Sequence, residues 1–127
     1  MEKLKIIFNT GYLSDEVLAL SKTFKLNELT NEKDIVQTIF NYLDKKKKSN
    51  KIIRLASNSS IVFYSFRLYI AKNYEDIDIT YQFNFKNGKH IQIKQNKKGD
   101  LFTTTGEDLP DGFFDTIDNI LLELILN

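Results

Sequence analysis

We expect residues 1–127 to form a single α/β domain on a mixed sheet of about five strands. Its length suits one domain with one core. Short strand-like segments precede helix-capping residues in the first half, and apolar and polar residues alternate in the second half. The expected order is strand, two helices, strand, helix, three-strand meander and helix, and an α+β arrangement is the alternative.

The first strand is expected over residues 4–8, where apolar and β-branched residues gather. A turn over residues 9–11 follows, and Ser14 with two acidic residues after it predicts a helix start. From about Asn31 the apolar residues recur every three to four positions, which predicts a second helix. This helix ends in the lysine run 45–48, which is favourable at a helix C-terminus.

A second strand is expected over residues 51–56, followed by a cap at residues 57–60 and a helix over residues 61–71. This helix is apolar on nearly every side, so we expect it to be central. Arg67 within it needs a partner if it is buried. Right-handed crossovers would make the two strands parallel in one sheet, with helices covering the faces.

Apolar residues alternate with polar ones from Asp76, and the alternation returns after a turn near Gly88. A two-residue turn would put the apolar residues of the two strands on opposite faces. A three-residue loop with a left-handed Gly88 instead pairs Phe83 with Ile91 and Tyr81 with Ile93. We therefore predict the three-residue loop, then a turn at residues 96–100.

A third meander strand is expected over residues 101–105, and a last helix from about Pro110. Its apolar stripe comprises Phe113, Phe114, Ile117, Ile120, Leu121, Leu124 and Ile125.

The composition points away from several classes of protein. Without cysteine there can be no disulfide and no thiolate metal site, which favours a cytoplasmic location. No apolar run is long enough for a membrane span or a leader peptide. The one histidine, His90, has no carboxylate near it in sequence, so we expect no enzyme activity, no metal and no cofactor.

The charges are segregated along the chain. Residues 45–98 hold thirteen cations and three acids, whereas residues 99–127 hold seven acids and no cation. Opposite surfaces of this kind give fast, specific association through electrostatic complementarity. Together with the small size and a lysine-rich composition typical of AT-rich genomes, this favours a non-catalytic protein that occludes another macromolecule. Toxin-immunity proteins and phage anti-defence inhibitors act in this way.

A protein is the expected partner, and two surfaces are expected to bind it. One is the outward, acid-free face of the hairpin with its turn, and the other is the polar side of the last helix. The partner-binding residues are Thr80, Gln82, Asn84, Lys86, Lys89, His90, Gln92, Lys94, Asp111, Asp115, Asp118 and Leu122. Leu122 also raises the alternative of a homodimer.

Two other functions stay open. A Rossmann-like domain would bind a nucleotide or phosphate at two strand-to-helix loops, provided that both lie at the same sheet edge. The ligand-binding residues would be Thr10, Gly11, Ser14, Ser57, Asn58, Ser59 and Ser60. A nucleic-acid binder would use the basic hairpin face, although Tyr81, Phe83 and Phe85 are expected on the opposite side, away from any base to be stacked.

Overall fold

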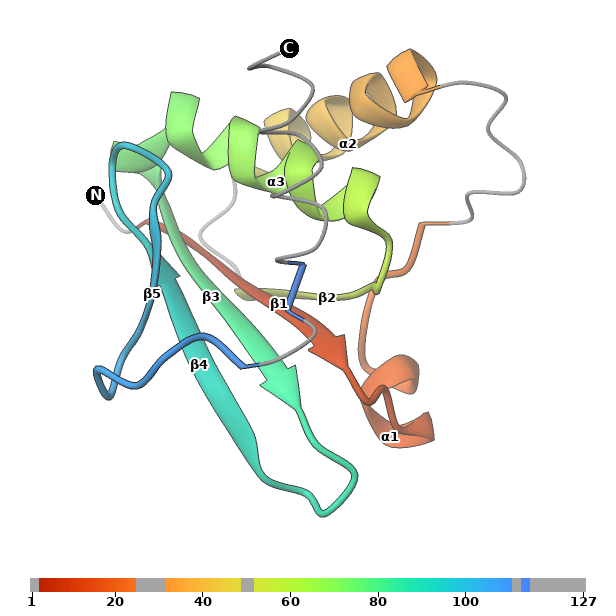
Figure 1. The fold of residues 1–127 in the computed structure, drawn as a ribbon. Coiled ribbons are helices and arrows are strands. Elements are labelled where there is room, and N and C mark those ends of the chain that lie inside the picture. Colours follow the sequence, from red (N-terminus) through yellow and green to blue (C-terminus); the bar gives the residue numbers. More distant parts are fainter. Residues whose placement is uncertain (1–2, 25–31, 49–51, 111–112, 115–127) are drawn as a thin grey trace, which may run out of the picture.

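The computed structural model describes residues 3–24, 32–48, 52–110 and 113–114. One five-stranded mixed sheet carries α2 and α3 packed above it (Figure 1). The strands are β1 Leu4–Gly11, β2 Ile52–Ala56, β3 Ile77–Asn84, β4 His90–Gln95 and β5 Leu101–Thr103, and the helices are α1 Asp15–Ala19, α2 Glu32–Lys46, α3 Ser60–Lys72 and the 3₁₀ turn η2 Tyr74–Asp76.

The strand order is β2-β1-β3-β4-β5. Strand β1 is parallel to both β2 and β3, and the ladders from β3 to β5 are antiparallel. The expected mixed α/β sheet with parallel first strands is therefore confirmed. The carboxyl ends of three parallel strands meet at one edge of this sheet.

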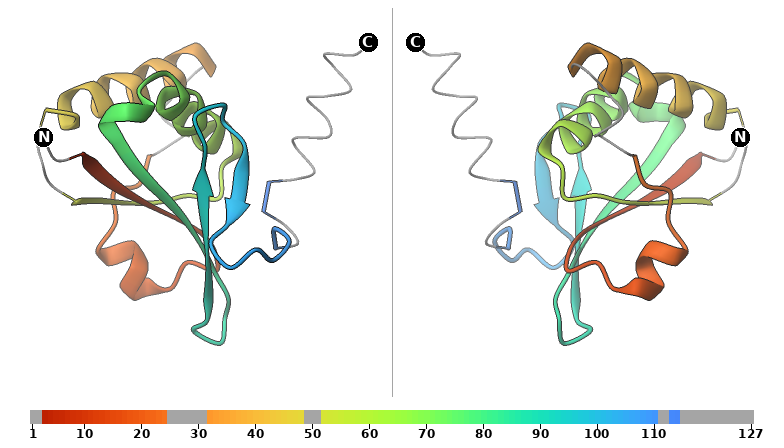
Figure 2. Two further views of the ribbon diagram at one scale, coloured as in Figure 1. Left: turned by 90° about the vertical axis from the view of Figure 1, so that its left-hand side faces the viewer. Right: turned by 90° about the vertical axis from the view of Figure 1, so that its right-hand side faces the viewer.

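The coverage of the sheet differs from the expectation. Connections that run in opposite directions along a sheet place their helices on opposite faces when both are right-handed. Here the chain moves from β1 out to β2 and then back past β1 to β3, yet α2 and α3 pack together on one face (Figure 2). The connection after β1 first passes through α1 on the other side, then reaches the outer edge of β2, where Lys22 pairs with Leu55. This path around the edge explains the shared face.

The core lies between that helical layer and the sheet. Strand residues facing the helices alternate with exposed ones, so Leu4, Ile6 and Phe8 of β1 are buried while Lys5 is exposed. Helix α2 buries Ile35, Ile39 and Leu43, a helical stripe. The rings of α3 complete the core, and Phe63 lies 5.2 Å from Tyr81, centroid to centroid. Helix α3 is central, as its composition predicts.

The hairpin of β3 and β4 confirms the parity argument. Phe83 pairs with Ile91, and Tyr81 pairs with Ile93. The backbone N–H of Phe85 donates to the Lys89 carbonyl at 2.9 Å, which closes a three-residue loop, and Gly88 has a φ of +87°. The next turn also forms as expected, since the Gly99 N–H donates to the Asn96 carbonyl at 3.0 Å.

Three element boundaries differ from the sequence expectation. Strand β1 continues to Gly11 through the expected turn over residues 9–11, because it stays paired with β3 that far, and Ser14 caps α1 as expected. Strand β5 ends at Thr103 rather than residue 105, because a turn closes at Gly106, whose N–H donates to the Thr103 carbonyl. At Pro110 and over 113–114 the chain is not helical, and Phe114 adopts a φ of 58°. The rest of the expected last helix lies outside the described residues.

Candidate functional site: an open sheet face

One face of the sheet carries no α2 or α3 helix, and we call it the open face (Figure 2). The strand registers arrange its side chains in rows across the sheet. Helix α1 lies on this side at the carboxyl end of β1, where Asn9 and Ala56 are buried. The rows are Ile52, Lys5 and Asp78; Arg54, Ile7, Thr80, Lys94 and Phe102; Ala56, Asn9, Gln82 and Gln92; and Gly11, Asn84 and His90.

The strand residues predicted to bind a partner lie together on the open face. Thr80, Gln82 and Asn84 come from β3, and they are half-buried between neighbouring strands. The β4 residues His90 and Gln92 are exposed. The sequence thus predicts the composition of this part of the face, because parity fixes which side each residue takes.

The expectation that this face lacks an acid is wrong. Asp78 lies on it, and its Oδ1 accepts a hydrogen bond from Lys94 Nζ at 3.0 Å. The same ammonium group donates to Thr80 Oγ1 at 2.6 Å. Asp78 precedes Thr80 by two residues on the strand, so the same alternation that places Thr80 also places Asp78 on this face.

The face is nevertheless basic. The exposed cations are Lys5 and Arg54 on the strands, with Lys86 and Lys89 at the hairpin tip. Among the described residues of the rows and the tip, these and Lys94 make five cations against one carboxylate. The sequence-based site did not include Lys5 and Arg54, because only the order of the strands in the structure shows that β1 and β2 continue the face of β3.

The face also carries apolar side chains that sequence reasoning missed. Phe102 is 49% exposed and lies in register with Lys94, and Ile52 is 51% exposed. Conversely, Tyr81 is fully buried on the helical side, and Phe83 packs 6.1 Å from Phe113. The expectation that these two aromatics point away from the basic face is confirmed. The described part of the face therefore combines cations, amides and two exposed apolar side chains, Phe102 and Ile52.

The two loops predicted to hold a nucleotide or phosphate do meet at one sheet edge. They meet through Asn58, whose Oδ1 accepts from the Thr10 hydroxyl at 2.6 Å and from the Gly11 N–H at 2.8 Å. Asn58 Nδ2 donates to the Gly11 carbonyl at 2.9 Å. These polar groups bond to each other across the gap between the loops.

The serines of these loops form local caps. Ser14 Oγ accepts from the Val17 N–H, and Ser59 Oγ accepts from the Val62 N–H. Ser57 Oγ accepts from the Ser59 N–H at 3.0 Å. Ser60 is the first residue of α3 and is half-buried. In the described part of the chain, every buried side-chain nitrogen and oxygen has a hydrogen-bond partner. No orphaned polar group there points to a ligand.

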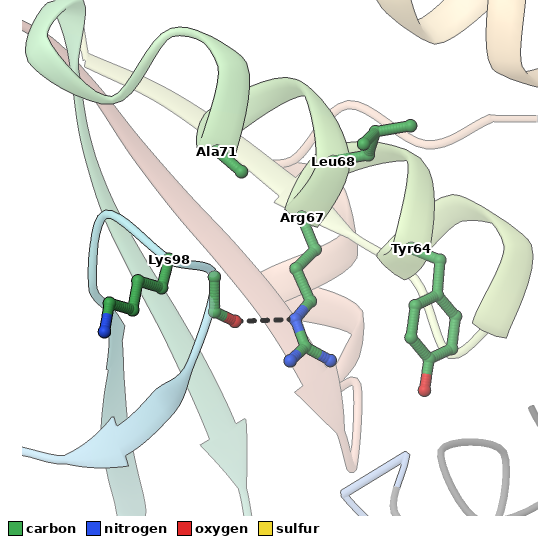
Figure 3. Close-up of a pocket in the computed structure, with 6 residues that line it drawn as sticks. Tyr64, Arg67, Leu68, Ala71 and Lys98 are labelled. Atoms are coloured by element: carbon green, nitrogen blue, oxygen red, sulfur yellow. Dashed lines mark hydrogen bonds between the residues drawn. The ribbon is translucent and has the colours of Figure 1, made fainter. Parts of the chain in front are cut away.

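A cavity of about 300 Å³ lies between α3 and the β4–β5 turn (Figure 3). Arg67 crosses it, and its Nε donates to the Gly99 carbonyl at 2.8 Å. Arg67 is half-buried, so this bond answers the need for a partner that its position in α3 raised. Tyr64, Leu68, Ala71 and Lys98 complete the lining.

The acidic part of the predicted partner surface is not described. Asp111, Asp115, Asp118 and Leu122 lie outside the described residues. Within the ranges described, no three His, Asp or Glu side chains gather as a metal site would require. None of the described helices has both the length and the apolar character needed to cross a bilayer.

Comparison with known proteins defines no family for this two-layer domain with its basic open face. No protein-family model matches the chain, and neither a curated protein nor a solved structure is similar to it. Functional inference therefore depends on the site itself.

Proposed function

We propose that this protein is a non-catalytic binding protein that occludes a surface of another macromolecule, as toxin-immunity proteins and phage anti-defence inhibitors do. One observation carries the proposal: the open face presents cations and exposed apolar side chains on a hydrogen-bonded sheet, with α2 and α3 packed on the opposite side. A preorganised surface loses little conformational freedom on association.

The charge of the open face favours an acidic protein as the partner. Lys5, Arg54, Lys86 and Lys89 are exposed, and Lys94 is balanced by Asp78. A positive surface steers an acidic partner and raises its association rate. A nucleic acid would also be attracted, but proteins that bind single strands use several aromatic platforms. Among the described residues of the open face, Phe102 is the one aromatic side chain.

The proposal is tested with matched charge-reversal variants. The face variant carries Arg54→Glu, Lys86→Glu and Lys89→Glu. The control carries Lys33→Glu, Lys45→Glu and Lys48→Glu, which reverse three exposed lysines of α2 and the residues after it. Both variants change the net charge equally, so a general charge effect would act on both.

The partner is first captured from a lysate of the native host with the wild-type chain, with and without nuclease, and then purified. We expect the purified partner to bind the control variant as it binds the wild type. The face variant should lose at least tenfold in affinity, mainly through slower association, whereas added salt should slow the association of the wild type and the control. Equal binding by both variants would refute the proposal, and a complex that nuclease destroys would support the nucleic-acid alternative.

A further inference from the structure

The sheet divides between β3 and β4. Their ladder ends at the pair of Tyr81 and Ile93, although β3 begins at Ile77 and β4 continues to Gln95. Beyond the pair of Tyr81 and Ile93, the start of β3 stays paired with β1, and the end of β4 stays paired with β5. The two halves of the sheet therefore separate, and we call the gap between them the fork.

Side chains bridge the fork where the backbone ladder stops. On the open side Lys94 Nζ bonds to Asp78 and Thr80. On the core side the Tyr81 hydroxyl donates to Gln95 Oε1 at 2.8 Å, and Gln95 Nε2 donates to the Arg67 carbonyl at 3.0 Å. The bonds of Lys94 and Tyr81 join the two halves across the fork, and the bond to Arg67 joins Gln95 to α3.

A cavity of about 220 Å³ occupies the fork, and we call it the fork pocket. Ile77 and Ile79 line it and are buried, whereas Phe102 lines it and is exposed. Its remaining lining residues are Lys3, Tyr74, Asp78, Lys94 and Gln95. The pocket thus combines apolar surface with two ammonium groups and one carboxylate.

The size and chemistry of the fork pocket restrict its occupant. Sites for drug-sized ligands and cofactors span roughly 300–1,000 Å³, so this pocket suits one side chain rather than a nucleotide. Two cations against one carboxylate favour an anionic group, and Phe102 offers an apolar contact for its aliphatic stem. Interfaces commonly concentrate their binding energy where one side chain fills such a pocket.

We propose that the fork pocket is the anchor position of the interface, where an aspartate or glutamate side chain of the partner protein binds to Lys94 and Lys3. This inference rests on the proposed function, because it names the contact that the open face offers to an acidic protein. Lys94 is already oriented by Asp78 and Thr80, so little side-chain freedom remains to be lost on binding.

The test uses two matched probes, N-acetyl-glutamate methylamide and its glutamine analogue, each titrated to about 10 mM into the ¹⁵N-labelled full chain. We expect the glutamate probe to shift the amide resonances of Ile79, Lys94 and Phe102, and the glutamine probe to shift them far less. Lys94→Gln should weaken glutamate binding about tenfold, as for the loss of one charge-assisted hydrogen bond. Lys97→Gln is the control, because the Lys97 side chain is highly exposed and does not line the fork pocket. Its Nζ lies 3.7 Å from Glu75 Oε1.

Equal shifts with both probes, no shifts at the fork, or unchanged binding by Lys94→Gln would overturn the inference. Binding assays with the purified partner distinguish a failure of this inference from a failure of the proposed function. If the triple face variant loses the partner while Lys94→Gln keeps it, the fork pocket is not the anchor but the open face still binds. If the probe binds at the fork and the triple variant keeps the partner, the proposed function fails.

Discussion

The side chain of Asn58 forms paired hydrogen bonds with the backbone of Gly11, accepting from its N–H at 2.8 Å and donating to its carbonyl at 2.9 Å. Through these bonds the loop that follows β2 is fixed to the end of β1. The Thr10 hydroxyl, which is buried, donates to the same Asn58 oxygen at 2.6 Å. One amide therefore ties together two adjacent parallel strands at their carboxyl ends.

Asn58→Ala should lower the free energy of unfolding by about 1–3 kcal/mol, because it leaves the Thr10 hydroxyl and Gly11 amide without their partners. Asn58→Asp keeps the acceptor but loses the donor, so it should fall between Ala and the wild type. Urea denaturation measures both. A midpoint for Asn58→Ala equal to that of the wild type would show that water replaces the side chain at no cost.

Gly11→Ala should be more destabilising than Gly88→Ala, although both glycines have positive φ values, +80° and +87°. The left-handed backbone costs an alanine about 1–2 kcal/mol at either position. At Gly11 the added Cβ would also lie 2.6 Å from the Asn84 carbonyl oxygen, whereas at Gly88 it meets nothing within 4 Å. Matched urea titrations measure the difference, and equal losses would contradict the close approach of β1 and β3 here.

The protein should lose stability in alkali through its buried tyrosines. Burial raises the pKa of Tyr81, and burial together with the Asp44 carboxylate raises the pKa of Tyr69. Unfolded tyrosines ionise near pH 10, so the free energy of unfolding should be level below that pH and fall above it, by up to about 1.4 kcal/mol per pH unit for each group. Tyr81→Phe should lower the free energy of unfolding at neutral pH, because Gln95 loses a hydrogen-bond donor. Above pH 10 the same variant should show a shallower fall in that free energy with pH. Urea titrations from pH 8 to 11 measure both, and an unchanged slope in this variant would contradict the assignment.

Phe102→Ala should separate binding from stability. Because Phe102 is 49% exposed, its removal should change the free energy of unfolding by no more than about 0.5 kcal/mol while weakening the complex with the partner. Phe63→Ala is the contrasting variant, since this ring is fully buried and stacks on Phe114 at 4.1 Å. It should cost about 3–5 kcal/mol. Thermal unfolding measures the stability of each variant, and titration with the partner measures its affinity. An unchanged affinity in Phe102→Ala would contradict a role for this ring in binding.

Much of the fold could be predicted from rules that act over a few neighbouring residues. The cap at Ser59, the left-handed Gly88 and the pairing of Phe83 with Ile91 follow from residue chemistry and strand parity, which act over a few positions. The order of the strands and the face on which α2 lies depend on contacts between distant segments. No local pattern signals that the chain passes Lys22 along the edge of β2 before reaching α2.

The candidate site shows the same division. Thr80, Gln82 and Asn84 could be placed on one face from alternation alone. Arg54 and Lys5 could not, because their membership depends on which strands are neighbours. Asp78 was within reach of the parity argument, and only its pairing with Lys94 needed the structure. Placing Phe102 in the site required both the register of β5 with β4 and the exposure of the Phe102 side chain.

The packing of α2 and α3 on one face divides the described strand residues into two sets of positions under different constraints. Ile79 and Tyr81 of β3 are buried in the core, whereas Thr80 and Gln82, which alternate with them, lie on the open face. Alternate residues of one strand can therefore be exchanged to follow a changing partner while the intervening residues preserve the fold. Such a scaffold can acquire new specificity in small steps without first becoming more stable.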